Sequence, residues 1–156
     1  MKILFLHGLE SNNRSSKVTY MRSQGHEVLA PSLNYYANPK LYLKILKRML
    51  DFKPKLIVGS SMGGYFALHL GTHFSTNILL LNPALPYRTI EPEIVEDGQQ
   101  KSKLWALLGK NDNVIDPIMN ENILKGFGAI IKKGNHFHRT PQYAFESFFN
   151  EVLENL

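Results

Sequence analysis

The chain has 156 residues, of which 44% are hydrophobic and 20% charged, and its formal net charge at pH 7 is +5. This length and composition predict one globular domain over residues 1–156, with a substantial hydrophobic core. The chain has no cysteine, which excludes disulfides, thiolate chemistry and zinc sites that use cysteine.

Short apolar runs alternate with helical patterns along the chain. The runs that predict strands are KILFLHG, HEVLAPSL, KLIVGSS, NILLLNP, KLWALLG and GAIIKKG. The stretches that predict helices are 14–24, 39–52 with Asn38 as its cap, 64–74, a segment that starts at Asp116, and a last one that opens at Thr140. Strands that are apolar on both faces need helices on each side. The sequence therefore predicts an α/β fold with three layers, in which helices cover both faces of a mainly parallel sheet of about six strands.

Several classes of protein are disfavoured by the same pattern. The N-terminal apolar run is too short for a secretory leader, and no window approaches the ~18 apolar residues of a membrane span. Lys40, Lys44 and Lys47 fall at helical spacing opposite an apolar stripe, as on the solvated face of an amphipathic helix. We therefore expect a cytoplasmic protein with neither a membrane nor a nucleic-acid partner.

Polar residues follow several of the predicted strands, and in a parallel sheet the carboxyl ends of the strands share one edge, where ligands bind. His7 follows the first strand, Ser61 the third, Asp112 the fifth and His136 the sixth. The sequence thus brings a serine, an aspartate and a histidine to one edge.

The segment GSSMG, from Gly59 to Gly63, fits the pattern G-x-S-x-G between a strand and a helix. Only Ser61 fits this frame, because a nucleophile at Ser60 would need glycines at two positions that are not glycine. The flanking glycines permit a sharp turn that exposes the serine hydroxyl. The pattern predicts a nucleophile elbow with Ser61 at its tip.

The chain order Ser61, Asp112, His136 matches the nucleophile–acid–histidine order of this arrangement. A serine hydroxyl needs a histidine to remove its proton and a carboxylate to orient that histidine. The developing oxyanion needs two backbone donors, for which we expect the N–H groups of Leu9 and Met62.

Other residues compete for these roles. Asp116 is an alternative acid, although its position before a proline is typical of a helix N-cap. His138 is an alternative histidine. Because it lies two residues past the strand, we interpret it as a surface residue. His69 and His73 have a spacing that can hold a metal, but no third ligand is in view and we expect surface or groove histidines.

Three further residues are candidates for the walls of the site. We expect His7 to shape the loop after the first strand, or alternatively to line the pocket. Tyr35 and Tyr36 follow the second strand and are candidates for a pocket wall or for plain packing. The irregular segment Asn82–Ser102 is a candidate loop or very short cap over the site.

The motifs FLHGLESNNRSSK, VGSSMGGYFA, NDNVID and GNHFH together resemble those of the α/β-hydrolases, and more narrowly of the small YqiA-like esterases. The resemblance spans about residues 3–149. It implies a compact hydrolase fold with a minimal cap, and hydrolysis of an ester or thioester through an acyl-serine intermediate, without a metal or organic cofactor. By motif it assigns Ser61, Asp112 and His136 to the triad, and Leu9 and Met62 to the oxyanion hole.

The sequence thus predicts a serine esterase or thioesterase that acts on small acyl substrates. A peptidase or a C–C bond hydrolase would use the same triad. A non-catalytic binding protein built on the hydrolase fold remains the alternative from another class, and a basic nucleic-acid binder is a weaker one.

Overall fold

The computed structural model describes residues 1–95, 98–99 and 101–156. Within these residues, six strands form one sheet in the order β2-β1-β3-β4-β5-β6, and each neighbouring pair is parallel. The elements in chain order are β1 (Lys2–Leu6), α1 (Ser16–Ser23), β2 (Glu27–Leu29), α2 (Leu41–Phe52), β3 (Leu56–Ser60), α3 (Met62–Phe74), β4 (Asn77–Leu81), β5 (Leu104–Gly109), α4 (Pro117–Gly126), β6 (Ile130–Gly134) and α5 (Gln142–Glu154).

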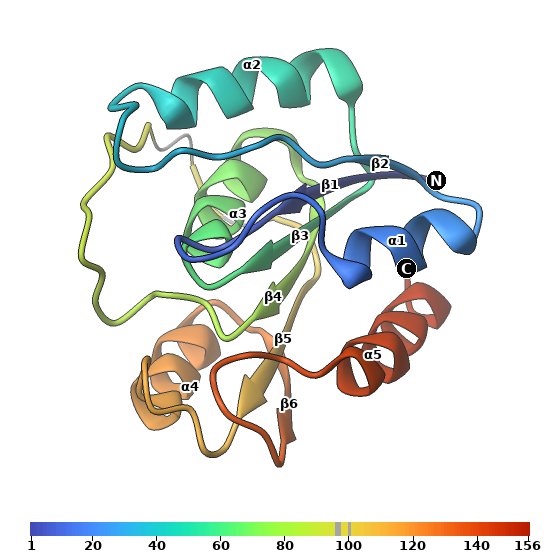
Figure 1. The fold of residues 1–156 in the computed structure, drawn as a ribbon, viewed down its shortest axis with the longest axis vertical. Coiled ribbons are helices and arrows are strands. Elements are labelled where there is room, and N and C mark those ends of the chain that lie inside the picture. Colours follow the sequence, from blue (N-terminus) through green and yellow to red (C-terminus); the bar gives the residue numbers. More distant parts are fainter. Residues whose placement is uncertain (96–97, 100) are drawn as a thin grey trace.

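Helices cover both faces of this sheet, with α1 and α5 on one side and α2, α3 and α4 on the other (Figure 1). Successive residues of a strand point to opposite faces. In β1, Leu4 and Leu6 pack into the core beneath α2 and α3, while Ile3 and Phe5 pack beneath α1 and α5. The predicted three-layer α/β fold is confirmed.

Most helices begin close to their predicted starts, with two instructive shifts. α3 starts at Met62 rather than at residue 64, directly after Ser61. α2 starts at Leu41 with Lys40 as its N-cap, rather than at Pro39 with Asn38 as the cap. The earlier start of α3 brings its N-terminus right against the serine.

The connection between β4 and β5 contains no helix or strand among its described residues. Its start lies against α3, where Arg88 stacks over the ring of Tyr65 at 3.9 Å from the centroid. Farther along, the carbonyl of Val95 accepts hydrogen bonds from Tyr42 and His73, at 3.1 and 2.7 Å. The predicted cap, Asn82–Ser102, falls partly on residues 96–97 and 100, which lie outside the described residues, and a cap role stays a prediction.

Among the described residues, no helix combines the length and the apolar character that a membrane crossing requires.

Candidate active site

Ser61 lies at the turn from β3 into α3, in a backbone conformation that few residues other than glycine adopt. Its φ is 51° and its ψ is −114°. The Ser61 N–H donates to the carbonyl of Leu81 at 3.0 Å, and the Ser61 carbonyl accepts from the N–H groups of Gly64 and Ala84 at 3.0 and 2.9 Å. These bonds to neighbouring elements hold the strained turn in place.

Two glycines make this turn possible. A Cβ at Gly63 would overlap the backbone carbonyl of Leu6 in the adjacent strand. A Cβ at Gly59 would overlap the carbonyl of Gly63 and the side chain of Ala67. Because most of these obstacles are backbone atoms, they cannot move aside. The G-x-S-x-G spacing is therefore required by the close packing of α3 against β3 and against the neighbouring strand β1.

The hydroxyl of Ser61 meets a histidine and an aspartate in one hydrogen-bonded row. The Nε2 atom of His138 lies 3.0 Å from Ser61 Oγ, and its Nδ1 atom lies 2.8 Å from Asp112 Oδ2. The Asp112 side chain is 1% exposed and that of His138 is 23% exposed. The row runs from a buried carboxylate outward to the hydroxyl.

The predicted histidine, His136, does not take part in this row, and His138 occupies that place instead. The His136 ring packs over Gly109 and Gly134, where any Cβ would overlap the ring or the His136 backbone. Its Nδ1 atom donates to the carbonyl of Phe137 at 2.8 Å. The histidine that reaches Ser61 therefore lies two residues farther along the chain than the predicted one.

Asp112 is held by backbone donors as well as by the histidine. Its Oδ1 atom accepts from the N–H groups of Val114 and Ile115, each at 2.9 Å. Burial alone would raise the pKa of Asp112, but the hydrogen bonds from His138 and from these two backbone groups outweigh it, so the pKa lies below its ordinary value. Asp112 is thus kept ionised beside the imidazole.

Asp116, the alternative acid, caps a helix. Its Oδ1 atom accepts from the N–H groups of Ile118 and Met119 at 2.8 and 3.3 Å, in the first turn of α4. This is the helix-capping role that its position before Pro117 indicated.

The loop after β1 lies against Ser61 and is fixed by a buried histidine. His7 Nδ1 donates to the carbonyl of Gly8 at 2.7 Å, and its Nε2 atom accepts from the N–H of Leu33 at 3.0 Å. The Tyr35 hydroxyl donates to the carbonyl of His7. Burial outweighs the bond to Gly8 and lowers the pKa of His7, which suits a neutral ring that accepts at Nε2. His7 shapes the loop, as expected.

The remaining predicted residues divide between the site and the surface. A Cβ at Gly8 would lie 3.2 Å from Ser61 Cβ, so the loop that carries Leu9 borders the serine on one side. Met62 follows the serine as the first residue of α3, where a helix leaves its N–H groups without intrahelical partners. Tyr35 is buried, whereas Tyr36 is 66% exposed. Tyr35 packs with the loop after β1, to which its hydroxyl is hydrogen-bonded, and Tyr36 is not held by the core.

His69 and His73 lie on α3, where each contacts an aromatic ring. The His69 ring meets Tyr65 edge-on with centroids 4.6 Å apart, and His73 Nε2 lies 3.1 Å from the Tyr42 hydroxyl. In the part of the chain that the structure describes, no three histidine, aspartate or glutamate side chains are grouped so as to hold a metal ion.

Asn82 is a residue of the site that sequence reasoning missed. It is 1% exposed, its φ is 42°, and it follows β4, which lies between β3 and β5 in the sheet. Its Nδ2 atom donates to the carbonyl of His138 at 2.6 Å, and its Oδ1 atom accepts from the N–H of Gly109 at 2.7 Å. Asn82 thereby ties together the connections that follow β4, β5 and β6. Its position at the carboxyl end of a strand is the signal by which it could have been found.

Structural comparison places the molecule among hydrolase folds. A protein of Xanthomonas campestris pv. campestris, described as a candidate hydrolase of the alpha/beta superfamily, superposes with a TM-score of 0.76 at 19% identity, over 99% of each chain. An esterase of Pyrococcus furiosus gives a TM-score of 0.74 at 16% identity, over 98% of this chain and 79% of that one. A pyrethroid hydrolase of Sphingobium faniae JZ-2 gives 0.69 at 12% identity, over 99% of this chain and 96% of that one. At these identities the comparisons establish the fold.

Sequence comparison gives the family. The profile described as uncharacterised protein family UPF0227 matches residues 2–101, a stretch that includes the Ser61 turn and ends before Asp112. The predicted family resemblance is thus confirmed, and the chain belongs to UPF0227, with the fold of the alpha/beta hydrolases.

Proposed function

We propose that this protein is a serine hydrolase that cleaves ester or thioester bonds of small acyl substrates through an acyl-serine intermediate. The observation that carries the proposal is the row of hydrogen bonds from Ser61 Oγ through His138 to Asp112. A hydroxyl at a strained turn, an imidazole within hydrogen-bond reach and a buried carboxylate behind it are the three parts of a nucleophile activated by a general base.

The reaction has two halves. His138 Nε2 takes the proton of Ser61 Oγ as the oxygen attacks the carbonyl carbon of the substrate. The imidazolium, stabilised by the ionised Asp112, then gives this proton to the leaving oxygen or sulfur, and the acyl group stays on the serine. In the second half, His138 takes a proton from water, which attacks the acyl-serine, and returns it to Ser61 Oγ as the acid departs.

The negative charge on the carbonyl oxygen needs fixed donors. We assign this role to the N–H groups of Met62 and Leu9. The first lies at the N-terminus of α3, where the helix dipole favours negative charge, and the second lies in the loop against Ser61. The bonds from His7 to Gly8 and Leu33 support this assignment, because they fix the loop that carries Leu9.

The structural relatives support a hydrolase, because one is an esterase and another a pyrethroid hydrolase. The triad and the backbone donors account for the reaction without a cofactor. We further propose that the protein works in the cytoplasm on a small-molecule substrate.

The proposal is tested by replacing the nucleophile and by labelling it. Ser61→Ala is expected to lose about 10⁴–10⁶-fold in kcat on p-nitrophenyl acetate. A fluorophosphonate probe is expected to label the native protein at Ser61 and to leave Ser61→Ala unlabelled. Undiminished activity in the variant would disprove the mechanism. Absence of both labelling and turnover would instead favour a binding protein. A panel of acyl esters, thioesters and peptides separates esterase, thioesterase and peptidase activity.

A further inference from the structure

Three cationic side chains lie at and just before the start of α1 and directly after the triad histidine. Arg139 follows His138 in the chain, Lys17 lies in the first turn of α1, and Arg14 precedes the Ser15 cap of that helix. We call these three residues, Arg14, Lys17 and Arg139, the basic rim. Arg14 and Arg139 belong to the connections that follow β1 and β6, which start at the same carboxyl edge of the parallel sheet as the Ser61 turn after β3.

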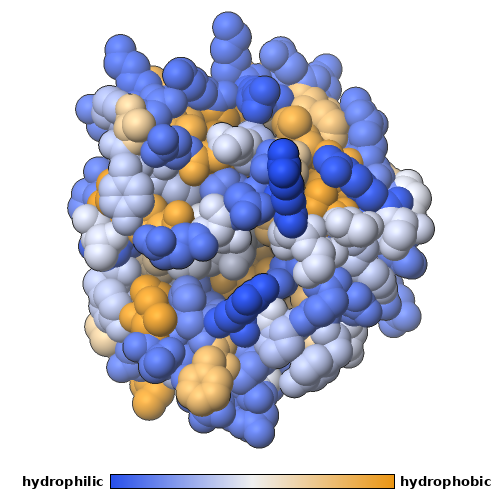
Figure 2. Space-filling view, in the orientation of Figure 1, coloured by the Kyte–Doolittle hydropathy of each residue, from blue (hydrophilic) through white to orange (hydrophobic). Residues whose placement is uncertain are grey.

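The start of α1 is fastened to the segment after His138, so the basic rim has a defined place. The Ser16 hydroxyl donates to Gln142 Oε1 at 2.7 Å, and the Lys17 ammonium donates to the carbonyl of Thr140 at 3.0 Å. Figure 1 shows α1 beside the connection from β6 to α5, and Figure 2 shows strongly hydrophilic side chains standing out on this face.

The cations of the rim have no carboxylate partner among the described residues, whereas several cations elsewhere do. Arg88 pairs with Glu91 at 2.7 Å, and Glu121 lies 2.9 Å from Lys125 and also pairs with Lys133. Within the described part of the chain, the only hydrogen bond from a rim side chain goes to the carbonyl of Thr140, a neutral acceptor. The Lys17 ammonium also lies over the ring of Phe145, 5.8 Å from its centroid, but no carboxylate among the described residues neutralises the positive charge of the rim.

The proximity of Lys17 and Arg139 has an electrostatic cost. Burial lowers the pKa of Lys17, and repulsion from the Arg139 guanidinium lowers it further. Two like charges held near each other disfavour the charged state, and an anion bound between them would relieve this repulsion. The free protein thus holds an arrangement that an anion would stabilise.

A groove adjoins the rim and offers room for a polar group. It has a volume of about 550 Å³ and lies along α1, and its lining includes Arg14, Arg22, Thr19 and Ser32. Guanidinium and hydroxyl groups are donors suited to phosphate and carboxylate oxygens. The groove shares Arg14 with the rim.

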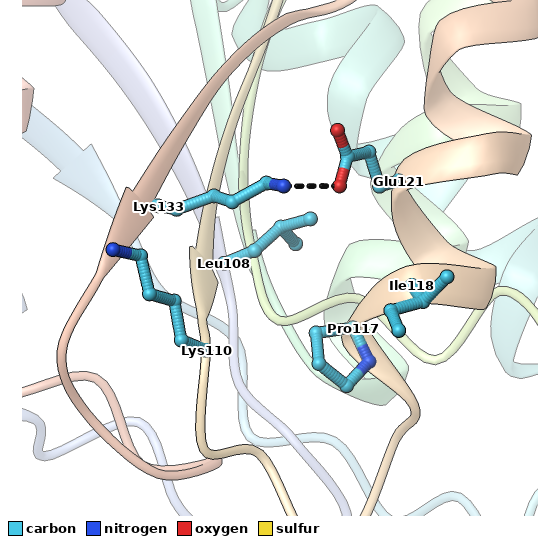
Figure 3. Close-up of a pocket in the computed structure, with 6 residues that line it drawn as sticks. All are labelled: Leu108, Lys110, Pro117, Ile118, Glu121 and Lys133. Atoms are coloured by element: carbon cyan, nitrogen blue, oxygen red, sulfur yellow. Dashed lines mark ion pairs between the residues drawn. The ribbon is translucent and has the colours of Figure 1, made fainter.

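A second hollow, between α4 and the end of the sheet, contrasts with the rim. It has a volume of about 110 Å³ and is lined by Leu108, Lys110, Pro117, Ile118, Glu121 and Lys133. In Figure 3 the Lys133 ammonium points at the Glu121 carboxylate, with which it forms an ion pair. Since its charge is largely compensated and it contains no triad residue, it is a poorer place for an anion.

We propose that the basic rim is an anion subsite, which binds a carboxylate or phosphate on the leaving-group side of the substrate. This inference rests on the proposed function and deepens it. His138 hands its proton to the leaving oxygen or sulfur, and Arg139 follows it directly in the chain. We therefore assign the subsite to the departing part of the substrate rather than to the acyl group. The subsite makes the enzyme selective for esters of anionic alcohols or thiols.

The test compares esters that share an acetyl group and an aromatic ring. Methyl 4-acetoxybenzoate is neutral, 4-acetoxybenzoate carries a carboxylate, and 4-acetoxyphenyl phosphate carries a phosphate. In Arg139→Gln, the ratio of kcat/KM for each anionic ester to kcat/KM for the neutral ester is expected to fall about 10-fold relative to the wild type. Comparison of the ratios for the carboxylate ester and the phosphate ester shows which anion the rim prefers. Arg48→Gln on α2, an exposed arginine elsewhere, is expected to leave both ratios unchanged.

A binding measurement separates failure of the subsite from failure of the hydrolase. By calorimetry, inorganic pyrophosphate is expected to bind the wild type and Ser61→Ala, and to bind Arg139→Gln at least about 10-fold more weakly. Normal ester hydrolysis with unchanged ratios in Arg139→Gln would overturn the subsite and leave the hydrolase intact. Absence of all ester hydrolysis would overturn the hydrolase, and equal pyrophosphate binding by wild type and Arg139→Gln would overturn the subsite on its own.

Discussion

At the scale of single residues, the site depends on which histidine follows β6 at the right distance. His138 lies 3.0 Å from Ser61 Oγ, whereas the His136 ring packs over two glycines and bonds to its own neighbour, Phe137. The two histidines are chemically identical, so only the path of the chain distinguishes them. The first prediction uses this difference.

His138→Ala is expected to lose about 10⁴–10⁶-fold in kcat on p-nitrophenyl acetate, because the serine loses its base, while the fold is retained. His136→Ala is the matched control. It removes a buried ring, so it is expected to lower the free energy of unfolding by about 1–3 kcal/mol and to keep kcat within about tenfold of the wild type. The value of kcat is measured for each variant at a temperature at which it is folded. Urea denaturation of each variant gives its free energy of unfolding. The opposite ranking of kcat would restore the role of His136.

A second prediction at this scale concerns His7 and pH. An unfolded histidine takes up a proton near pH 6.5, but burial lowers the pKa of His7 in the folded protein. Between these two values the unfolded chain binds more protons, so the free energy of unfolding falls as the pH drops below about 6.5. The slope for one group is at most about 1.4 kcal/mol per pH unit. Stability from His7 is thus complete above pH 6.5 and lost in acid.

His7→Gln isolates this contribution. A glutamine oxygen can still accept from the N–H of Leu33 but does not titrate, so the variant is expected to show a shallower loss of stability between pH 6.5 and the folded pKa. Urea denaturation at several pH values measures the difference, and His26, whose pKa burial also lowers, contributes equally to both proteins. Parallel curves of unfolding free energy against pH for the wild type and the variant would contradict the prediction. They would show that the pKa of His7 is the same in the folded and the unfolded protein.

At the scale of elements, the site is a set of strand ends whose relative positions are fixed by Asn82. Its side chain joins the carbonyl of His138 to the N–H of Gly109, and its own N–H donates to Leu107 at 3.1 Å. Because misplacement by about 1 Å can cost 10²-fold in rate, a residue that touches no reacting atom can still control the reaction. We expect Asn82 to act as a positioning residue.

Asn82→Gly and Asn82→Ala are expected to lower kcat by about 10–100-fold, since both lose the bonds to the His138 loop. They differ in stability. Glycine accepts the φ of 42° freely, whereas alanine at positive φ costs about 1–2 kcal/mol more. Equal kcat with unequal unfolding free energies would separate positioning from stability. A kcat within twofold of the wild type in Asn82→Gly would remove Asn82 from the site.

At the scale of the whole molecule, the sequence predicted best those elements whose local residue pattern agrees with their place in the fold. Runs of residues that are apolar on both faces of a strand predicted the six strands. The glycines at 59 and 63 predicted the turn at Ser61, because a side chain at either position would overlap nearby backbone atoms. The edge strand β6 is largely exposed, yet its pairing to β5 gives it the same parallel direction.

The rest of the site depends on loop paths that no local pattern encodes. His138 reaches Ser61 only because the chain after β6 turns back over Gly109, and Asn82 reads in the sequence merely as the end of an apolar run. The proximity of Lys17 to Arg139 joins residues more than a hundred positions apart and needs the packing of α1 against α5. Such long-range placements follow from tertiary structure alone.

The whole molecule also separates the elements that stabilise it from those that react. The core beneath α1 and α5 contains fully buried phenylalanines, among them Phe149, whose ring lies 5.4 Å from that of Phe145. The groups that we propose to react lie at the carboxyl edge of the sheet. Substitutions in this core are therefore expected to change stability without changing the chemistry of the molecules that remain folded.

Phe149→Ala is expected to lower the free energy of unfolding by about 3–5 kcal/mol, a large share of the ~5–15 kcal/mol typical of a domain. Phe127→Ala, at an exposed position after α4, removes the same side chain and is expected to change it by no more than about 0.5 kcal/mol. At a temperature where both variants are folded, active-site titration with a fluorophosphonate gives the concentration of competent molecules, and kcat per competent molecule should match the wild type. A lower kcat per titrated site in Phe149→Ala would mean that the packing of α5 reaches the His138 loop, and that the same core both stabilises the fold and positions the base.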